Sequence, residues 1–294
     1  MPAVSVVIPS FRGGWLLREA IASVQSQTLT DWELIIVLDG CEEDLADIEH
    51  ADTRVRTIRQ SRRGVSVARN VGIHSARSEL IALLDDDDRM LPDRLLLQSA
   101  AMVDDAISIS HTQYRIIDQR GVTVSEGGAT ASSYTDFLRG RSEILSATAM
   151  FRKRSFQEVG GYNSLLPLGE GQDFFYRVAR EGRVAFVPEV LYEYRLHDSN
   201  VWQGTSSGSG ETALILRQHY FAARARGEVE NLRAVRRGLS VIPPQRVAKA
   251  MGLASKARSS HAYVTTIGAL SWALCLSPIY TLKAIFRELS RRRR

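Results

Sequence analysis

The stretch Leu80-Ile81-Ala82-Leu83-Leu84-Asp85-Asp86-Asp87-Asp88 places four consecutive carboxylates directly after an apolar run. Such a run predicts a buried strand, and open α/β sheets bind their ligands at the carboxyl ends of strands. Side chains alternate across a strand, so we expect Asp85 and Asp87 on one side and Asp86 and Asp88 on the other. Carboxylates this close repel each other unless protons or a metal neutralise them. The stretch therefore predicts a site for Mg²⁺ or Mn²⁺ and a phosphorylated ligand, the alternative being a solvated acidic turn.

Strand-like and helix-like segments alternate through the first part of the chain. The expected strands cover residues 4–8, 33–38, 54–59 and 79–84, and the helices between them cover 15–27 and 65–76. This alternation indicates a mostly parallel sheet flanked by helices, with the strand ends converging on one crevice. Further along we expect helices at 93–103 and 174–180, strands at 107–117, 122–124 and 144–151, and a strand at 184–187 that Pro188 stops.

Composition and charge are those of a globular protein with an uneven distribution of basic residues. The 294 residues carry a net charge of +5, yet residues 241–294 hold ten Lys and Arg against the single acid Glu288. Such a tail suggests an anionic partner such as lipid headgroups, or only a solubilising terminus. No nucleic acid is expected, because no aromatic residue interrupts Arg291–Arg294. The first apolar run is too short for a signal peptide, which predicts a cytoplasmic catalytic body, at the inner face of the cell membrane if the tail binds lipid.

The glycine- and serine-rich run at residues 204–210 marks the clearest break in the chain. We therefore expect a domain at 1–203, a linker at 204–210 and a helical, basic extension at 211–294. Residues 262–282 carry no charge over a length sufficient to cross a membrane, but several of them are polar. Amphipathic helices lying on the membrane surface are the favoured interpretation, with a true span and a helical cap on the core as alternatives.

Several segments, in order along the chain, carry the pattern of a known family. They are Val4–Phe11, Ser23–Thr28, Glu33–Gly40, Gly64–Ile73, Leu84–Asp88, Val159–Tyr162 and Tyr194–His197. Over about residues 3–200 the chain resembles the family 2 inverting glycosyltransferases, which have the nucleotide-sugar-binding α/β fold called GT-A. The resemblance implies transfer of a single sugar from a nucleoside diphosphate-sugar to an acceptor hydroxyl. No Gln-x-x-Arg-Trp occurs, which argues against a processive polysaccharide synthase.

The resemblance also implies which residues bind the donor and the metal. Asp39 would contact the nucleotide base, although Leu38 replaces the first acid of the family's Asp-Asp-Gly. Asp87 and Asp85 would hold the cation against the diphosphate, and His197 would approach it. The donor-binding residues are then Pro9, Ser10, Arg12, Asp39, Arg69, Asp85 and Asp86. Purely structural alternatives are a turn at Asp39, an ion pair at Arg69 and a hydrogen bond at His197.

The general base is less clear, because the chain departs from the family where that base is expected. Inverting transfer needs a group that takes the proton from the acceptor hydroxyl. In Glu170-Gly171-Gln172-Asp173, the glycine stands where the family places its base. Asp173 is slightly favoured for this role and Glu170 is its close rival. Alternatively, Asp173 only caps the helix at 174–180.

Two other functions remain open. Gly171 at the base position is compatible with a non-catalytic protein that binds nucleotide-sugars. The acids Asp85–Asp88 alone would also suit a phosphotransfer enzyme. That interpretation does not explain why the other segments of the family pattern occur in the family's order. A glycan or lipid-linked acceptor and peripheral membrane contact through the tail are expected partners of the leading reading.

Overall fold

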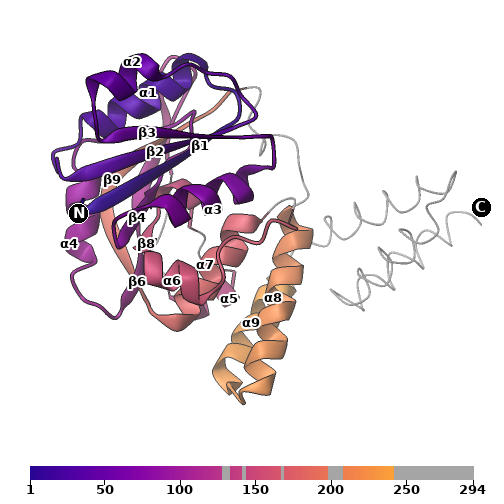
Figure 1. Ribbon diagram of the computed structural model, residues 1–294. Coiled ribbons are helices and arrows are strands. Elements are labelled where there is room, and N and C mark those ends of the chain that lie inside the picture. Colours follow the sequence, from indigo (N-terminus) through magenta and orange to yellow (C-terminus); the bar gives the residue numbers. More distant parts are fainter. Residues whose placement is uncertain (128–132, 141–143, 167–168, 198–207, 242–294) are drawn as a thin grey trace, which may run out of the picture. The chain divides into compact units, whose positions relative to one another are not determined.

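The computed structural model describes residues 1–127, 133–140, 144–166, 169–197 and 208–241 of the chain (Figure 1). The chain forms two compact units. The first comprises residues 1–137 and 142–203, and the second comprises residues 138–141 and 204–294. The first unit contains the sheet, and the described helices of the second are α8 (Gly208–Ala225) and α9 (Val229–Val241).

A nine-stranded sheet forms the centre of the first unit. Its order is β3-β2-β1-β4-β8-β6-β9-β5, with β7 paired to β6. The strands are β1 (Val4–Ser10), β2 (Trp32–Asp39), β3 (Val55–Gln60), β4 (Leu80–Leu83), β5 (Arg89–Met90), β6 (Ile107–Ile117), β7 (Thr123–Gly127), β8 (Met150–Arg152) and β9 (Arg183–Arg195). Strands β3, β2, β1 and β4 are parallel, whereas β8 runs antiparallel to both of its neighbours. The predicted α/β sheet is confirmed, with a mixed second half.

Helices cover both faces of this sheet (Figure 1). They are α1 (Gly14–Gln25), α2 (Ala46–Ala51), α3 (Val65–Ser75), α4 (Arg94–Ala101), α5 (Tyr134–Leu138), α6 (Lys153–Glu158) and α7 (Glu170–Glu181), with a 3₁₀ turn η1 at Ser146–Thr148. Alternate residues of β1 enter two cores, Val6 and Ile8 on the side of α1 and α4, and Val7 on the side of α3, α6 and α7. Because both faces are covered, β1 and β2 are apolar over nearly their whole length.

Helix α3 lies unusually close to the sheet because it carries a glycine at the contact. A Cβ at Gly72 would lie 2.5 Å from the Val7 side chain, so no larger residue fits without a shift. This approach holds α3, which also carries Arg69, against β1 and β2. The position of Arg69 therefore depends on a packing detail as well as on the helix itself.

Two predicted strands are wrong in extent. Strand β9 continues through Pro188 to Arg195, and its pairing with β6 shifts from Thr112–Val187 to Gln113–Val190. The irregularity accommodates the proline, which cannot donate a hydrogen bond to the sheet. The expected strand at 144–151 instead holds η1 followed by the short β8. Residues Ala147 and Ala149 are buried where the segment contacts β4 and β6, and burial alone does not require a strand.

In the second unit, α8 and α9 form a helical hairpin joined by residues 226–228. Helix α8 begins at Gly208, so residues 208–210 of the expected linker are helical. Residues 204–207 and the tail, including 262–282, lie outside the described residues. Among the helices that are described, none is long and apolar enough to cross a membrane.

Candidate active site

The four acids of the 85–88 stretch contact four different parts of the fold. Strand β4 ends at Leu83, so the expected strand does not extend to the acids. The contacts are Asp85 Oδ1 with Arg69 Nη2 at 2.8 Å, Asp86 Oδ2 with Ser10 Oγ at 2.6 Å, Asp87 Oδ2 with His197 Nε2 at 2.8 Å, and Asp88 Oδ2 with the Tyr192 hydroxyl at 2.5 Å. The turn therefore connects its carboxylates to β1, α3, β9 and the residue His197 after β9.

Crowding and burial make this turn a place where a cation would be stabilising. Burial, and then repulsion by Asp87 and Asp85, raise the pKa of Asp86 to about 6. The pKa values of Asp87 and Asp88 are raised by the same two causes. These raised pKa values mean that the protein only partly compensates the negative charge of the three carboxylates.

The oxygen atoms of the turn suit Mg²⁺ or Mn²⁺. Within the described residues, no group of three or more His, Cys, Asp or Glu side chains is arranged to hold a metal ion. Mg²⁺ needs only one or two carboxylates when substrate phosphates and water complete its shell. Asp85 and Asp87 supply such a pair, with side chains that are 32% and 26% exposed. The donor set therefore fits a divalent cation that binds together with a diphosphate.

Arg69 joins the acidic turn to helix α7. Its guanidinium donates to Asp85 Oδ1 through Nη2 at 2.8 Å and to Glu170 Oε1 through Nη1 at 2.9 Å. Burial alone would lower the pKa of Arg69, but the neighbouring carboxylates, with Asp85 the strongest, raise it instead. The Tyr162 ring lies 5.5 Å from the guanidinium and stacks on Phe174. A fixed positive charge is thus held between the expected diphosphate end and the expected acceptor end of the site.

Helix α7 presents its two acids in different surroundings. Glu170 is the first residue of the helix and its side chain is 18% exposed. Asp173 is only 3% exposed, and its Oδ2 accepts from both Nε and Nη2 of Arg177 at 3.0 and 2.5 Å. The N-cap position belongs to Gly169, so Asp173 lies in the first turn and does not cap the helix. Of the two, only Glu170 contacts the Arg69–Asp85 pair.

The glycine at the family's base position has a packing role in this chain. A Cβ at Gly171 would lie 1.9 Å from Ser146 Oγ and 3.2 Å from Ser146 Cβ of η1. A side chain at residue 171 therefore requires the Ser146 side chain to shift.

We expect Gly171→Ala to lower the free energy of unfolding by about 1–3 kcal/mol, because it overpacks the contact with Ser146. In a Ser146→Gly background the same substitution should cost much less, since the clashing hydroxyl is absent. Urea unfolding of the two single variants and the double variant measures this coupling. Additive costs would show that Gly171 and Ser146 do not constrain each other.

The expected nucleoside side is built from the ends of β1 and β2. Pro9 and Ser10 are the last residues of β1, and Arg12 is exposed just beyond them. The Asp39 carboxylate accepts from Gln60 Nε2 at 2.7 Å and from the backbone N–H groups of Arg63 and Gly64 at 2.7 and 2.8 Å. In this structure Asp39 therefore organises the segment before α3, while Ser10 reaches the acidic turn through Asp86.

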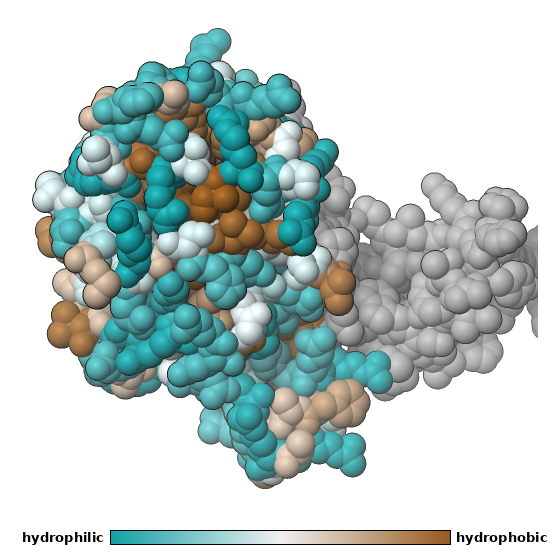
Figure 2. Space-filling view, viewed as in Figure 1, coloured by the Kyte–Doolittle hydropathy of each residue, from teal (hydrophilic) through white to brown (hydrophobic). Residues whose placement is uncertain are grey.

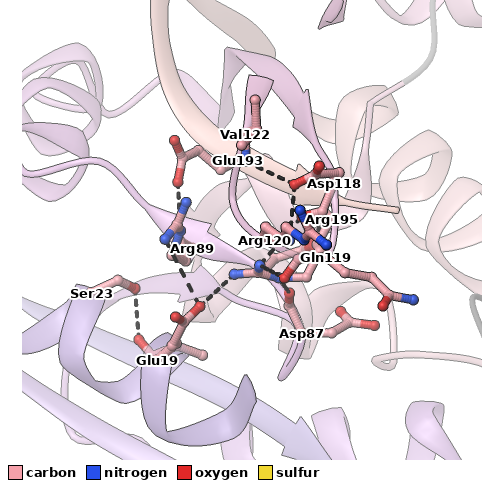
Figure 3. Close-up of polar contacts among 12 residues, drawn as sticks. Glu19, Ser23, Asp87, Arg89, Asp118, Gln119, Arg120, Val122, Glu193 and Arg195 are labelled. Atoms are coloured by element: carbon pink, nitrogen blue, oxygen red, sulfur yellow. Dashed lines mark hydrogen bonds and ion pairs between the residues drawn. The ribbon is translucent and has the colours of Figure 1, made fainter. Parts of the chain in front are cut away.

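Arg195, which belongs to the Tyr194–His197 segment of the family pattern, contacts the acidic turn directly. Its side chain is 1% exposed, and Figure 3 shows it among Asp87, Asp118, Gln119 and Glu19. Nε donates to the Asp87 carbonyl at 2.9 Å, Nη1 to the Gln119 carbonyl at 3.0 Å, and Nη2 to Glu19 Oε2 at 2.5 Å. Its backbone N–H also donates to Asp88 Oδ1 at 2.7 Å. Arg195 thus anchors the acidic turn to α1 and to the turn between β6 and β7.

A second charged group lies beside Arg195. The Glu193 carboxylate accepts from Arg89 Nε at 2.6 Å and from Arg115 Nε at 2.8 Å, and Figure 3 shows Arg89 between Glu193 and Glu19. The neighbouring hollow is lined by Glu19, Ala22, Ser23, Ser26, Arg89, Met90 and Glu193. Strand β9 also carries Arg183, Glu189 and Arg195, so the charge of Glu193 did not by itself distinguish it in the sequence.

This combination of a parallel α/β sheet with acids after β4 defines a GT-A-type glycosyltransferase domain. Solved structures support the fold: S. aureus TarS aligns with a TM-score of 0.66 at 14% identity, covering 97% of this chain and 55% of that chain. The complex of TarS 1–349 with UDP-GlcNAc aligns with a TM-score of 0.63 at 12% identity, covering 98% and 92%. The sequence model of Glycosyl transferase family 2 matches residues 5–160, more than half of the chain. The chain therefore belongs to that family, as its sequence pattern predicted.

Two curated relatives illustrate the match. An uncharacterized glycosyltransferase of Rickettsia felis is 36% identical over 210 residues, covering 67% of this chain and 34% of the relative. The putative teichuronic acid biosynthesis glycosyltransferase TuaG of Bacillus subtilis is 26% identical over 227 residues, covering 74% of this chain and 88% of TuaG. The chain spans only 24–34% of the length of three of the curated relatives it matches.

Proposed function

We propose that this chain catalyses the metal-dependent, inverting transfer of a single sugar from a nucleoside diphosphate-sugar to an acceptor hydroxyl. The observation that carries the proposal is the bridge made by Arg69. One buried cation contacts Asp85, expected beside the diphosphate, and Glu170, expected beside the acceptor. This arrangement connects the two ends of a transfer reaction within one hydrogen-bonded group.

On the donor side, Asp85 and Asp87 would hold the divalent cation and Pro9, Ser10 and Arg12 would cradle the nucleoside. A divalent cation bound there would neutralise charge that develops on the leaving diphosphate. His197 orients the Asp87 carboxylate through their 2.8 Å contact. Arg69 adds a fixed positive charge that needs no rearrangement during the reaction. Asp39 supports the nucleotide-binding loop, and its role in base recognition remains part of the proposal.

On the acceptor side, Glu170 takes the proton from the acceptor hydroxyl. The hydroxyl oxygen attacks the anomeric carbon as the bond to the diphosphate oxygen breaks, which inverts the anomeric centre. A carboxylate at the start of a helix is favoured in its ionised form, the form a base needs. Glu170 is preferred over Asp173 because its side chain is more exposed and because it contacts the Arg69–Asp85 pair.

The acceptor and the location are inferred from chemistry and relatives. A relative named for teichuronic acid biosynthesis supports an acceptor in cell-surface glycan assembly, either a glycan or a lipid-linked one. The basic tail would give peripheral contact with the inner face of the cell membrane, which places catalysis on the cytoplasmic side.

Donor binding should stabilise the protein only when a divalent cation is present. In a screen of nucleotide-sugars with and without Mn²⁺, the matching donor at about 100 times its Kd should raise the free energy of unfolding by about 2.7 kcal/mol. Asp87→Asn should lose most of the Mn²⁺-dependent part. Asp105→Asn, at an exposed acid, should keep all of it.

If the donor raises the free energy of unfolding equally with and without Mn²⁺, and equally in wild type and Asp87→Asn, the donor site is not metal-dependent. With the donor identified, the anomeric configuration of the product, measured by proton NMR, should be opposite to that of the donor. Retention would contradict the inverting mechanism.

A second function is favoured by one observation. Gly171 cannot accept a carboxylate unless the Ser146 side chain moves, and no carboxylate stands at the family's usual base position. A protein that binds a nucleotide-sugar without consuming it is compatible with this. If the protein binds its donor fully but forms no product with any acceptor tested, the non-catalytic binding function would be favoured over sugar transfer.

A further inference from the structure

Helices α8 and α9 carry a stripe of exposed arginines, defined here as Arg217, Phe221 and Arg224 of α8 with Arg233 and Arg236 of α9. Residues advance by about 100° along a helix, so positions 217, 221 and 224 fall on one side of α8. All five residues are exposed, and Phe221 is 51% exposed. Figure 2 shows mainly hydrophilic residues with a few apolar ones over the part of the hairpin in view. The stripe therefore combines charge with one accessible aromatic ring.

The stripe lies opposite the buried side of each helix. The buried residues of α8 are Ile215, Leu216, His219 and Ala223, and those of α9 include Ala234 and Val235. The two halves of the stripe adjoin, because Arg236 Nη2 lies 3.4 Å from the Tyr220 hydroxyl of α8. The Arg217 guanidinium lies 5.6 Å from the Phe221 ring. One continuous basic surface thus runs across both helices.

The arginines of the stripe have no acidic partner among the described residues. Some exposed arginines of the first unit are paired, for example Arg18 with Asp47 and Arg183 with Asp104. Among the described residues, no ion pair joins Arg217, Arg224, Arg233 or Arg236 to a carboxylate. The nearby acids are engaged elsewhere, Glu228 with Arg226 and Glu230 with Arg139. Uncompensated charge of this kind is complementary to an anionic surface.

We propose that this stripe docks the protein on an anionic lipid bilayer. The charges would lie at the headgroups, and Phe221 would enter the boundary between headgroups and acyl chains. Single-stranded nucleic acid, the other polyanion to consider, is usually bound by several accessible aromatic rings along a groove. Here one ring is more than half exposed on a two-helix surface. Docking is independent of the proposed sugar transfer, but it would bring the enzyme to a lipid-linked acceptor.

Co-sedimentation of the full chain with lipid vesicles tests the proposal. Wild type should bind vesicles containing about 30 mol% phosphatidylglycerol and not vesicles of phosphatidylcholine alone, and added salt should weaken binding. Replacing Arg217, Arg224 and Arg233 together by glutamine should lower the partition coefficient roughly 100-fold, at about fivefold per arginine. The matched triple lysine variant keeps the charge and should bind like wild type. Phe221→Ser should reduce binding several-fold.

The substituted side chains are exposed, and circular dichroism checks that each variant is folded. Because the tail is present in every variant, the comparison isolates the stripe. No wild-type binding to anionic vesicles, or undiminished binding by the glutamine variant, would overturn the proposal. So would tighter binding to an oligonucleotide than to anionic vesicles. Sugar transfer to a soluble acceptor is measured separately, so loss of docking and loss of catalysis are distinguishable.

Discussion

Glu170→Gln should lower kcat by about 10²–10⁴-fold while leaving donor binding nearly unchanged, because the variant loses the proton acceptor and keeps the site's shape. Glutamine still accepts the hydrogen bond from Arg69 Nη1 through its amide oxygen. Turnover at saturating donor and acceptor gives kcat, and thermal shift with Mn²⁺ gives donor binding. A lower kcat with unchanged donor binding would show that the substitution affects the chemical step and not the binding of the donor.

Asp173→Asn is the matched control, because it makes the same chemical change one turn further along α7. We expect it to retain most turnover and to lose stability, since Asp173 is buried against Arg177. Loss of turnover in Asp173→Asn with wild-type turnover in Glu170→Gln would move the base to Asp173. Equal losses in both would indicate that α7 positions the site as a unit.

Arg69→Met should have the largest effect on stability, at about 3 kcal/mol, and should also abolish turnover. The substitution leaves Asp85 and Glu170 facing each other without the cation that joins them. Removing one partner of a buried ion pair costs about 3–5 kcal/mol, and the lower end applies because solvent reaches Asp85. Urea unfolding measures the change. Arg69→Lys should recover part of the stability, since an ammonium cannot serve both carboxylates with the geometry of a guanidinium.

A surface pair provides the comparison for that experiment. Arg18→Met removes an exposed partner of Asp47 and should change the free energy of unfolding by less than about 1 kcal/mol. If Arg69→Met costs no more than this, Arg69 is not a structural bridge. A double variant with Glu170→Gln should show a smaller cost for removing Arg69, because one of the two charges left unpaired is then absent.

Local patterns were informative wherever neighbours in sequence decide the structure. Strand β6 spans the same residues, 107–117, as its apolar pattern predicts, and β1, β2 and β4 follow their apolar runs closely. Strand β9 was predicted too short because proline usually ends a strand, and only its irregular pairing with β6 shows how Pro188 is tolerated. The strand before the acids was predicted correctly, but it ends at Leu83, so the alternation of a strand cannot be extended to Asp85–Asp88.

The site shows the same division between local and long-range information. Arg69 and Glu170 are separated by 101 positions, so no spacing rule could predict their contact. The choice between Glu170 and Asp173 depends on burial and on Arg177, which are properties of the packed helix. Arg195 and Glu19 are 176 positions apart in the sequence, so the contact by which Arg195 anchors the acidic turn to α1 could not be predicted without the fold.

The sequence by itself determined the family, the order of the main elements and the acids that identify the donor side, because apolar periodicity and motifs are carried by neighbouring residues. Only the tertiary structure decided which partners those acids have, why Gly171 is retained beside Ser146, and which side of the α8–α9 hairpin carries unpaired charge. The physical reason is that hydrogen bonds and ion pairs act over about 3–4 Å, a distance that folding brings about between residues far apart in the chain.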